Sequence, residues 1–221
     1  KIIQKKKLNY IVVIPARYKS SRLEGKMLMK IGEDSIIVRT CKKSLETKIK
    51  KIYVLTDHID IFNEITNNFT LNEVEPIMTP DNMKNGVSRM SWTINNNLID
   101  EKYNIIVNVQ GDEPFINPYN IDYLIGLHLH HNIQNKENVF CSTLHDKCSD
   151  LEYVKSTAPL KVVISKTNRV LYYSRSVIPL DKYSDLLKEY NIENNFIDEI
   201  DWKMKEDNLY DLDFFDPYFY V

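Results

Sequence analysis

The chain is poor in the residues that mark disulfide-rich and zinc-binding proteins. Among its 221 residues are only three cysteines, and Cys41, Cys141 and Cys148 show no Cys-x-x-Cys spacing. An odd number without that spacing argues against a disulfide framework and against a structural zinc site. We interpret all three as reduced thiols in a cytosolic type of compartment.

Long apolar runs and an excess of charge of one sign are also missing. No run approaches the ~20 apolar residues of a membrane-spanning helix, and the lysine-rich start at 1–7 lacks the apolar stretch of a secretory signal. The 29 basic and 31 acidic side chains nearly cancel, so no global field attracts nucleic acid or an anionic membrane. The sequence predicts a cytoplasmic protein with no membrane span and no nucleic-acid partner, in which any anion site is local.

The first part of the chain alternates short apolar runs with helix-like stretches. The apolar runs, which suit parallel strands covered on both faces, lie at 10–14, 52–56, 74–78 and 105–109. Stretches with apolar residues at roughly helical spacing lie at 35–44, 59–67 and 87–98. This order predicts an α/β fold with a mostly parallel, open sheet of Rossmann-like type in residues 1–137.

The last part of the chain has a different texture. Runs typical of strands occur at 139–143, 160–164 and 170–174, with little helix between them. We therefore expect residues 138–221 to form a smaller, more antiparallel β portion. Within it, the twelve carboxylates and four lysines of 181–216 indicate a solvated excursion.

Ligands of open parallel sheets bind beyond the carboxyl ends of the strands. The segments that follow the four predicted strands are 15–26, 57–58, 79–86 and 110–114, and we expect them to meet at one site. Of only five glycines in the chain, Gly25, Gly86 and Gly111 lie in these segments. Glycine there lets the backbone approach a ligand or adopt positive φ.

The first of these segments is strongly cationic. In Ile14–Lys26, "IPARYKSSRLEGK", the side chains that suit a polyphosphate are Arg17, Ser20, Arg22 and Lys26. They offer guanidinium forks, a hydroxyl and an ammonium group. The spacing of neither a Walker loop nor a dinucleotide-binding glycine turn is present, so side chains are expected to grip the phosphates.

A carboxylate closes the fourth predicted strand. In "NVQGDEPF", Asp112 follows Gly111 at the carboxyl edge of the sheet, which is a usual place for a ligand of a hard cation such as Mg²⁺. The alternative is a turn in which the aspartate only caps the next helix. A metal that bridges phosphate oxygens fits the cationic first segment better.

These motifs resemble those of the 3-deoxy-manno-octulosonate cytidylyltransferase (CMP-Kdo synthetase) family. Besides "IPARYKSSRLEGK" and "NVQGDEP", the chain shares "TDH" at 56–58, "LKVV" at 160–163 and "LYYSR" at 171–175. The resemblance extends over roughly 10–179. It implies a nucleotidyltransferase fold in which CTP and Kdo give CMP-Kdo and pyrophosphate, with Mg²⁺, for lipopolysaccharide biosynthesis. It also implies a homodimer formed through the second portion.

The resemblance implies roles for particular residues. Lys26 and Asp112 would be catalytic, and Asp112 would bind Mg²⁺. Contacts to CTP would come from Arg17, Ser20, Arg22, Lys26, Thr79, Gly86 and Arg89. The sugar would be held by Gln110, Tyr173 and Arg175.

The chain departs from the family pattern in three places. Glu24 stands where the family has proline, and segment 81–89, "DNMKNGVSR", lacks an imidazole and two hydroxyls of the family motif. A second Mg²⁺-binding aspartate, carried by a Val-Asp-Thr-Pro-Glu-Asp segment, is absent. We expect truncation to explain this absence, and we do not take Asp211, Asp213 or Asp216 as substitutes.

Two other functions stay open. One is a cytidylyltransferase for a nine-carbon acid of the sialic type, although "QGDEP" favours Kdo. The other is a catalytically silent nucleotide-binding homologue. A zinc site at His128, His130 and His131 is disfavoured, because no cysteine or carboxylate lies at ligand spacing.

Overall fold

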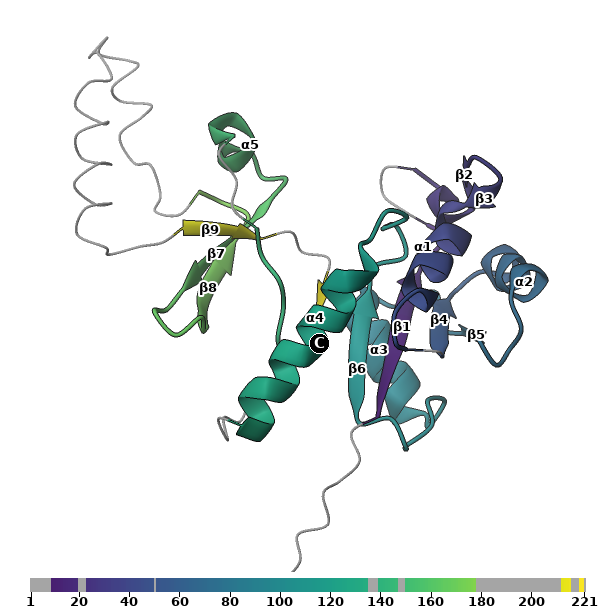
Figure 1. The fold of residues 1–221 in the computed structure, drawn as a ribbon. Coiled ribbons are helices and arrows are strands. Elements are labelled where there is room, and N and C mark those ends of the chain that lie inside the picture. The colour runs from purple at the N-terminus through teal and green to yellow at the C-terminus, as the bar shows by residue number, and fades with distance from the viewer. Residues whose placement is uncertain are drawn as a thin grey trace, which may run out of the picture. The chain divides into compact units, whose positions relative to one another are not determined.

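The computed structural model describes residues 9–19, 23–49, 51–134, 139–146, 150–177, 212–215 and 219–220. The chain divides into two compact units (Figure 1). The first comprises residues 1–143 and 218–221, and the second comprises residues 144–217.

The first unit is built on the predicted parallel sheet. Four parallel strands are β1 (Tyr10–Ala16), β4 (Ile52–Thr56), β5 (Val74–Met78) and β6 (Ile105–Val109). Strand β10 (Phe219–Tyr220) adds antiparallel to β6, which gives the order β10-β6-β1-β4-β5. The α/β fold expected from the sequence is confirmed. Strand β1 is longer than expected, because Pro15 and Ala16 continue the pairing with Leu55 and Thr56.

Helices follow the strands along the chain. The first unit contains α1 (Ile36–Leu45), α2 (Ile59–Asn68), α3 (Gly86–Asn95), α4 (Pro118–Leu129), the single turns η1 (Lys26–Leu28) and η2 (His130–Gln134), and the hairpin β2 (Lys30–Ile31) and β3 (Asp34–Ser35). Helix α3 begins where Asn85 and Ser88 form a reciprocal capping box. It ends earlier than the expected residue 98, because Asn97 takes a left-handed φ of 54°.

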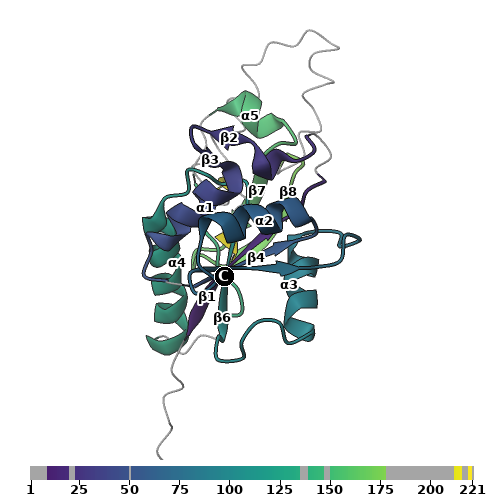
Figure 2. The ribbon, with the colours of Figure 1, turned by 90° about the vertical axis from the view of Figure 1, so that its right-hand side faces the viewer.

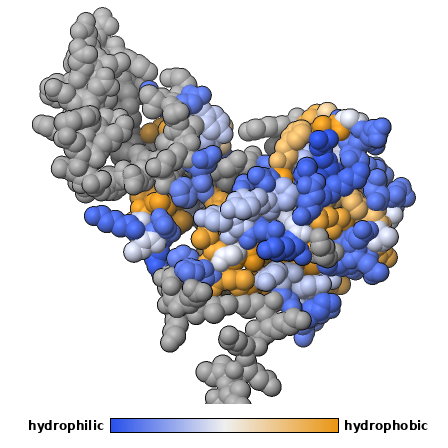
Figure 3. All heavy atoms as spheres, viewed as in Figure 1, coloured by the Kyte–Doolittle hydropathy of each residue, from blue (hydrophilic) through white to orange (hydrophobic). Residues whose placement is uncertain are grey.

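Apolar side chains cover both faces of the sheet. On one face, Val12 and Ile14 of β1 pack in a cluster with residues of α1, α2 and α4. On the other, Ile11 and Val13 pack with strand residues and with Met90 of α3. Figure 2 shows α1 and α2 on one side of the sheet and α3 on the other. Burial on both faces is why the strands read as continuous apolar runs. On the surface of the first unit visible in Figure 3, hydrophilic residues are interspersed with hydrophobic ones.

One expected strand is wrong. Residues 139–143 have no regular secondary structure, and at the start of this segment the side chain of Asn132 takes both backbone groups of Val139. The Val139 amide donates to Oδ1 of Asn132 at 2.9 Å, and Nδ2 of Asn132 donates to the Val139 carbonyl at 3.1 Å. A side-chain amide thus replaces the partner strand that Val139 would need.

The second unit contains a small antiparallel sheet. Its strands are β7 (Leu160–Ile164), β8 (Val170–Ser174) and β9 (Leu212–Phe215), in the order β8-β7-β9, and a short helix α5 (Leu151–Lys155) precedes them. The first two strands were expected. The rest of the acidic segment 181–216 lies outside the described residues, but 212–215 belong to a strand and not to a solvated excursion.

Lys161 of β7 is buried, and its ammonium group is hydrogen-bonded to backbone carbonyl groups. Its ammonium group donates to the carbonyl oxygens of Arg175 at 2.7 Å, of Pro159 at 3.3 Å and of Ser156. Burial, together with the nearby Arg175 charge, lowers the pKa of Lys161.

Candidate active site

Four segments that follow parallel strands converge at the carboxyl end of the sheet, and Pro15 lies between two of them. A Cβ atom added to Gly86 would lie 2.9 Å from Cγ of Pro15, and one added to Gly111 would lie 3.0 Å from the Pro15 carbonyl oxygen. The first distance would force Pro15 to shift, and the second is tighter than ordinary Cβ contacts, so that the Pro15 carbonyl would have to move by a few tenths of an ångström. Glycine at both positions therefore lets these backbone segments approach the end of β1 closely.

The first segment reaches the fourth through an ion pair. The ammonium nitrogen of Lys26 lies 2.6 Å from Oδ2 of Asp112, with the two side chains 38% and 30% exposed. Lys26 opens the turn η1 directly after Gly25, whose φ of 67° is left-handed. Asp112 follows Gly111 in the turn after β6. These two groups were expected at one site from the sequence, and they are in contact.

A second set of contacts joins the other two segments. Oδ1 of Asp57, in the segment after β4, accepts a hydrogen bond of 2.9 Å from the backbone amide of Tyr18. Oδ2 of the same carboxylate lies 2.8 Å from a guanidinium nitrogen of Arg89 in α3. Arg89 also donates to the Thr79 hydroxyl, which in turn donates to the Thr56 carbonyl at 3.0 Å. All four segments are thus connected to one another by these contacts.

The residues expected to bind CTP are placed in different ways. Lys26 lies at the convergence, while Thr79 and Arg89 are buried beside it and Gly86 begins α3. Arg17 is exposed directly after β1. Ser20 and Arg22 lie outside the described residues.

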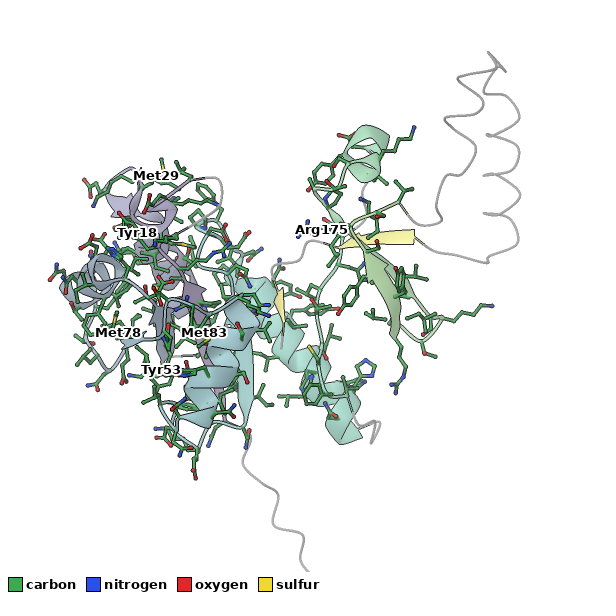
Figure 4. The ribbon with its side chains drawn as sticks, turned by 180° about the vertical axis from the view of Figure 1, so that it is seen from behind. Tyr18, Met29, Tyr53, Met78, Met83 and Arg175 are labelled. Atoms are coloured by element: carbon green, nitrogen blue, oxygen red, sulfur yellow. The ribbon has the colours of Figure 1, made fainter. Side chains whose placement is uncertain are left out.

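The residues expected on the sugar side belong to both units. Gln110 is half-buried directly after β6 in the first unit. Tyr173 is an exposed residue of β8 in the second unit. Arg175, labelled in Figure 4, donates to the carbonyl oxygens of Ala158 at 2.6 Å and Thr157 at 3.3 Å within that unit.

Asp112 is the residue of this site best suited to a divalent cation. No group of three or more His, Cys, Asp or Glu side chains in the described part of the chain is arranged to hold a metal. Mg²⁺ is usually bound through one or two carboxylates together with substrate phosphates and water. The accessible carboxylate of Asp112 beside a cationic segment therefore fits Mg²⁺ that is also bound by the oxygens of a triphosphate.

Cys41 and His128 could suggest other chemistry, but burial and hydrogen bonds indicate that both have structural roles. Cys41 is fully buried in α1, and burial raises the pKa of its thiol, which makes it a poor nucleophile. The ring of His128 is hydrogen-bonded to Ser142 at 2.8 Å and to Asn132 at 3.1 Å. Its partners are thus a hydroxyl and an amide.

No role was predicted from the sequence for Asp57, Tyr18 or Asn108. The first belongs to the "TDH" motif, which was noted only as a point of resemblance, and the last to "NVQGDEP". Asn108 is 2% exposed, and neither its amide nitrogen nor its amide oxygen has a partner among the described residues.

Comparison with known proteins finds a consistent set of relatives. The cytidylyltransferase family pattern matches residues 11–215. A 3-deoxy-manno-octulosonate cytidylyltransferase of Psychromonas ingrahamii is 33% identical over 196 residues, covering 88% of this chain and 71% of that protein. One of Francisella philomiragia is 36% identical over 176 residues, covering 79% of this chain and 66% of that protein.

A solved structure is similar in fold. A CMP:2-keto-3-deoxy-manno-octonic acid synthetase in complex with CTP superposes with a TM-score of 0.66 at 27% identity. The match covers 80% of this chain and 68% of that one.

In the described part of this chain, no helix combines the length and apolar character needed to cross a bilayer.

Proposed function

This chain belongs to the 3-deoxy-manno-octulosonate cytidylyltransferase family, and from this we propose that it transfers CMP from CTP to Kdo and releases pyrophosphate. The observation that carries the proposal is the contact between Lys26 and Asp112. It brings a phosphate-binding cation and a metal-binding carboxylate together at the end of a parallel sheet, where ligands of such sheets bind. The names of the relatives supply the sugar.

The triphosphate would bind along the cationic segment after β1. Arg17, Ser20, Arg22 and Lys26 are the residues that we assign to it. Lys26 is a point charge at the convergence of the segments, suited to an oxygen on which negative charge accumulates. Thr79, Gly86 and Arg89 are the residues assigned to the nucleoside side of the same site.

We assign Mg²⁺ to Asp112. When bound there, the ion would neutralise phosphate charge and polarise the phosphorus that is attacked. The exposure of Asp112 supports the assignment, because substrate oxygens and water must complete the coordination shell. Its carboxylate can exchange the Lys26 ammonium for a cation without unpacking the core.

The chemistry requires little from the protein beyond position and charge. The anomeric hydroxyl of Kdo attacks the α-phosphorus: a bond from that oxygen to phosphorus forms, the hydroxyl proton passes to water, and the bond from the α-phosphorus to the oxygen that bridges to the β-phosphate breaks, so that pyrophosphate leaves. Holding the two substrates in line and neutralising the phosphates supply the rate enhancement. Gln110, Tyr173 and Arg175 are the residues that we assign to the sugar.

We also propose that the protein is a homodimer formed through the second unit. Strand β8 lies at the edge of the described sheet, and Leu171, Tyr172 and Tyr173 are exposed on it. An apolar edge strand is a ready partner for another chain. Sedimentation velocity should show a dimer for the unaltered protein and a monomer for Leu171→Lys. A monomer in both cases would refute the dimer.

The sialic and silent alternatives make different predictions in one assay. The altered segment 81–89 supports the silent form, because Asn85 and Ser88 use their side chains to cap α3. The full-length protein should be given CTP, Mg²⁺ and either Kdo or N-acetylneuraminate, and pyrophosphate release recorded. Release with Kdo alone supports the proposal, release with neuraminate alone supports the sialic alternative, and CTP binding without release indicates the silent form.

A further inference from the structure

Asp57 makes two bonds that point to different parts of the site. Its side chain is 10% exposed, so nearly all of its polar surface faces protein. One oxygen accepts the Tyr18 backbone amide at 2.9 Å, and the other accepts a guanidinium nitrogen of Arg89 at 2.8 Å. One carboxylate therefore bonds both to the cationic segment after β1 and to helix α3.

The Arg89 side is closed to solvent. Arg89 is 2% exposed, and its other terminal nitrogen donates to the Thr79 hydroxyl and to the Pro80 carbonyl at 3.4 Å. Charge-assisted bonds of this kind are strong in a buried setting. The guanidinium is engaged by the ends of β4 and β5, and this arrangement gives Arg89 a role that does not depend on touching the nucleotide.

The Tyr18 side leads to Lys26. The ring of Tyr18 (Figure 4) stacks on the ring of His58, with 3.7 Å between centroids and 15° between planes. The Tyr18 carbonyl accepts a hydrogen bond of 3.0 Å from the amide of Gly25. Lys26 is the next residue. The Tyr18 carbonyl therefore joins the two ends of the loop that precedes Lys26, and the Tyr18 amide is bound by Asp57.

We propose that Asp57 is a positioning residue for the CTP site: it couples the place of Lys26 to helix α3 through Tyr18 on one side and Arg89 on the other. This inference depends on the proposed function, because it assumes that the cationic segment binds the triphosphate of CTP. Asp57 itself is not required to touch substrate. Its effect reaches the ligand through the two elements that it holds.

Asp57→Asn tests the coupling selectively. An asparagine oxygen can still accept the Tyr18 amide, but its NH₂ group would face the donors of Arg89 and leave a buried cation without its charge partner. We expect the dissociation constant for Mg-CTP, measured by calorimetry without sugar and well below the unfolding temperature, to rise about tenfold or more. A residue with only a structural role would lower the unfolding temperature and leave that constant unchanged.

A matched control lies at the opposite end of the same two strands. Lys51, just before β4, and Glu75 of β5 form an ion pair of 2.7 Å. Glu75→Gln removes one partner of that pair far along the strands from the convergence. We expect it to leave the CTP dissociation constant within about twofold.

A double-mutant cycle shows whether the pair acts as a unit. If it does, Asp57→Asn with Arg89→Gln binds CTP no more weakly than the worse single variant. Independent, additive losses would overturn the coupling. If Asp57→Asn does not fold, Arg89→Lys is the second variant. The lysine keeps a cation opposite Asp57, but it cannot bond to Thr79 at the same time. Unchanged CTP affinity in folded Arg89→Lys would also overturn the proposed coupling.

The outcomes separate this inference from the proposed function. If the unaltered protein does not bind CTP, the proposed function fails. If the unaltered protein binds CTP and Asp57→Asn binds it equally well, only the positioning role of Asp57 fails.

Discussion

The ammonium nitrogen of Lys26 lies 2.6 Å from the carboxylate of Asp112, although 86 residues separate them in the chain. Parallel strands β1 and β6 are neighbours in the sheet, so the segments after them emerge side by side. An ion pair of this exposure contributes about 0–1 kcal/mol to stability. Both groups can therefore change partners at low cost, as a site that binds phosphate and metal requires.

Replacing Asp112 should separate activity from stability. We expect Asp112→Asn to reduce pyrophosphate release by about 100-fold or more, as loss of a charge-stabilising group does. Its unfolding temperature should stay close to that of the unaltered protein, because the carboxylate is partly exposed and such an ion pair contributes little to stability. Asp34→Asn is the matched control, since Asp34 forms an ion pair of the same 2.6 Å with Lys42. Near-normal turnover in Asp112→Asn would refute the assigned role.

Two glycines should respond to alanine in opposite directions. A Cβ on Gly111 would press on the Pro15 carbonyl, on Met27 Sδ at 3.2 Å and on Ile37 Cδ1 at 3.3 Å. We expect Gly111→Ala to lower the free energy of unfolding by about 1–3 kcal/mol and to weaken CTP binding. Gly126, in α4, has no atom within 4 Å of such a Cβ, so Gly126→Ala should stabilise by about 0.5–1 kcal/mol. Urea denaturation measures both, and equal effects would contradict the close approach.

Asn108 should be replaceable by leucine without loss of stability. Its buried amide has no partner among the described residues, and such a group costs about 1–3 kcal/mol. We expect Asn108→Leu, which has a similar shape, to raise the free energy of unfolding by a similar amount. Thr93→Val is the contrasting variant, because the Thr93 hydroxyl donates to the Arg89 carbonyl at 2.9 Å, and its loss should destabilise by about 0.5–1.5 kcal/mol. A marked loss of stability in Asn108→Leu would show that the amide is satisfied after all.

The protein should lose stability in mild acid through His128. Burial lowers the pKa of His128 below its ordinary value of 6.5, so the unfolded chain takes up a proton more readily than the folded one. Stability is then fully present above that ordinary value and is lost as the pH falls toward the folded pKa.

Denaturant midpoints between about pH 5 and 8 measure this effect. Removing the imidazole in His128→Gln should flatten the dependence of the midpoint on pH. His130→Gln, which replaces an exposed residue, should leave it in place. An unchanged slope in His128→Gln would assign the acid sensitivity to another group.

Local sequence determined the four parallel strands of the first unit and the helices α1 and α2, whereas helix α4 and the hairpin of β2 and β3 were not predicted. Strands β4, β5 and β6 have the bounds expected from their mostly apolar runs, because strands covered on both faces are mostly apolar. The polar segments after those strands were expected to meet, since parallel strands present their carboxyl ends at one edge. That rule alone predicted that Lys26 and Asp112 lie at one site, and no further detail of the sequence was needed.

Tertiary structure decided which groups are paired and which segments form strands. Arg89 was read as a nucleotide contact, and only the fold brings Asp57 to its guanidinium. Residues 139–143 have a strand-like composition, yet the Asn132 side chain takes the Val139 backbone. Residues 212–215 lie in an acidic run, yet they pair with β7. Local periodicity indicates which residues of a helix or strand are buried. The partner of a buried charge or of a backbone group depends instead on residues far away in the chain.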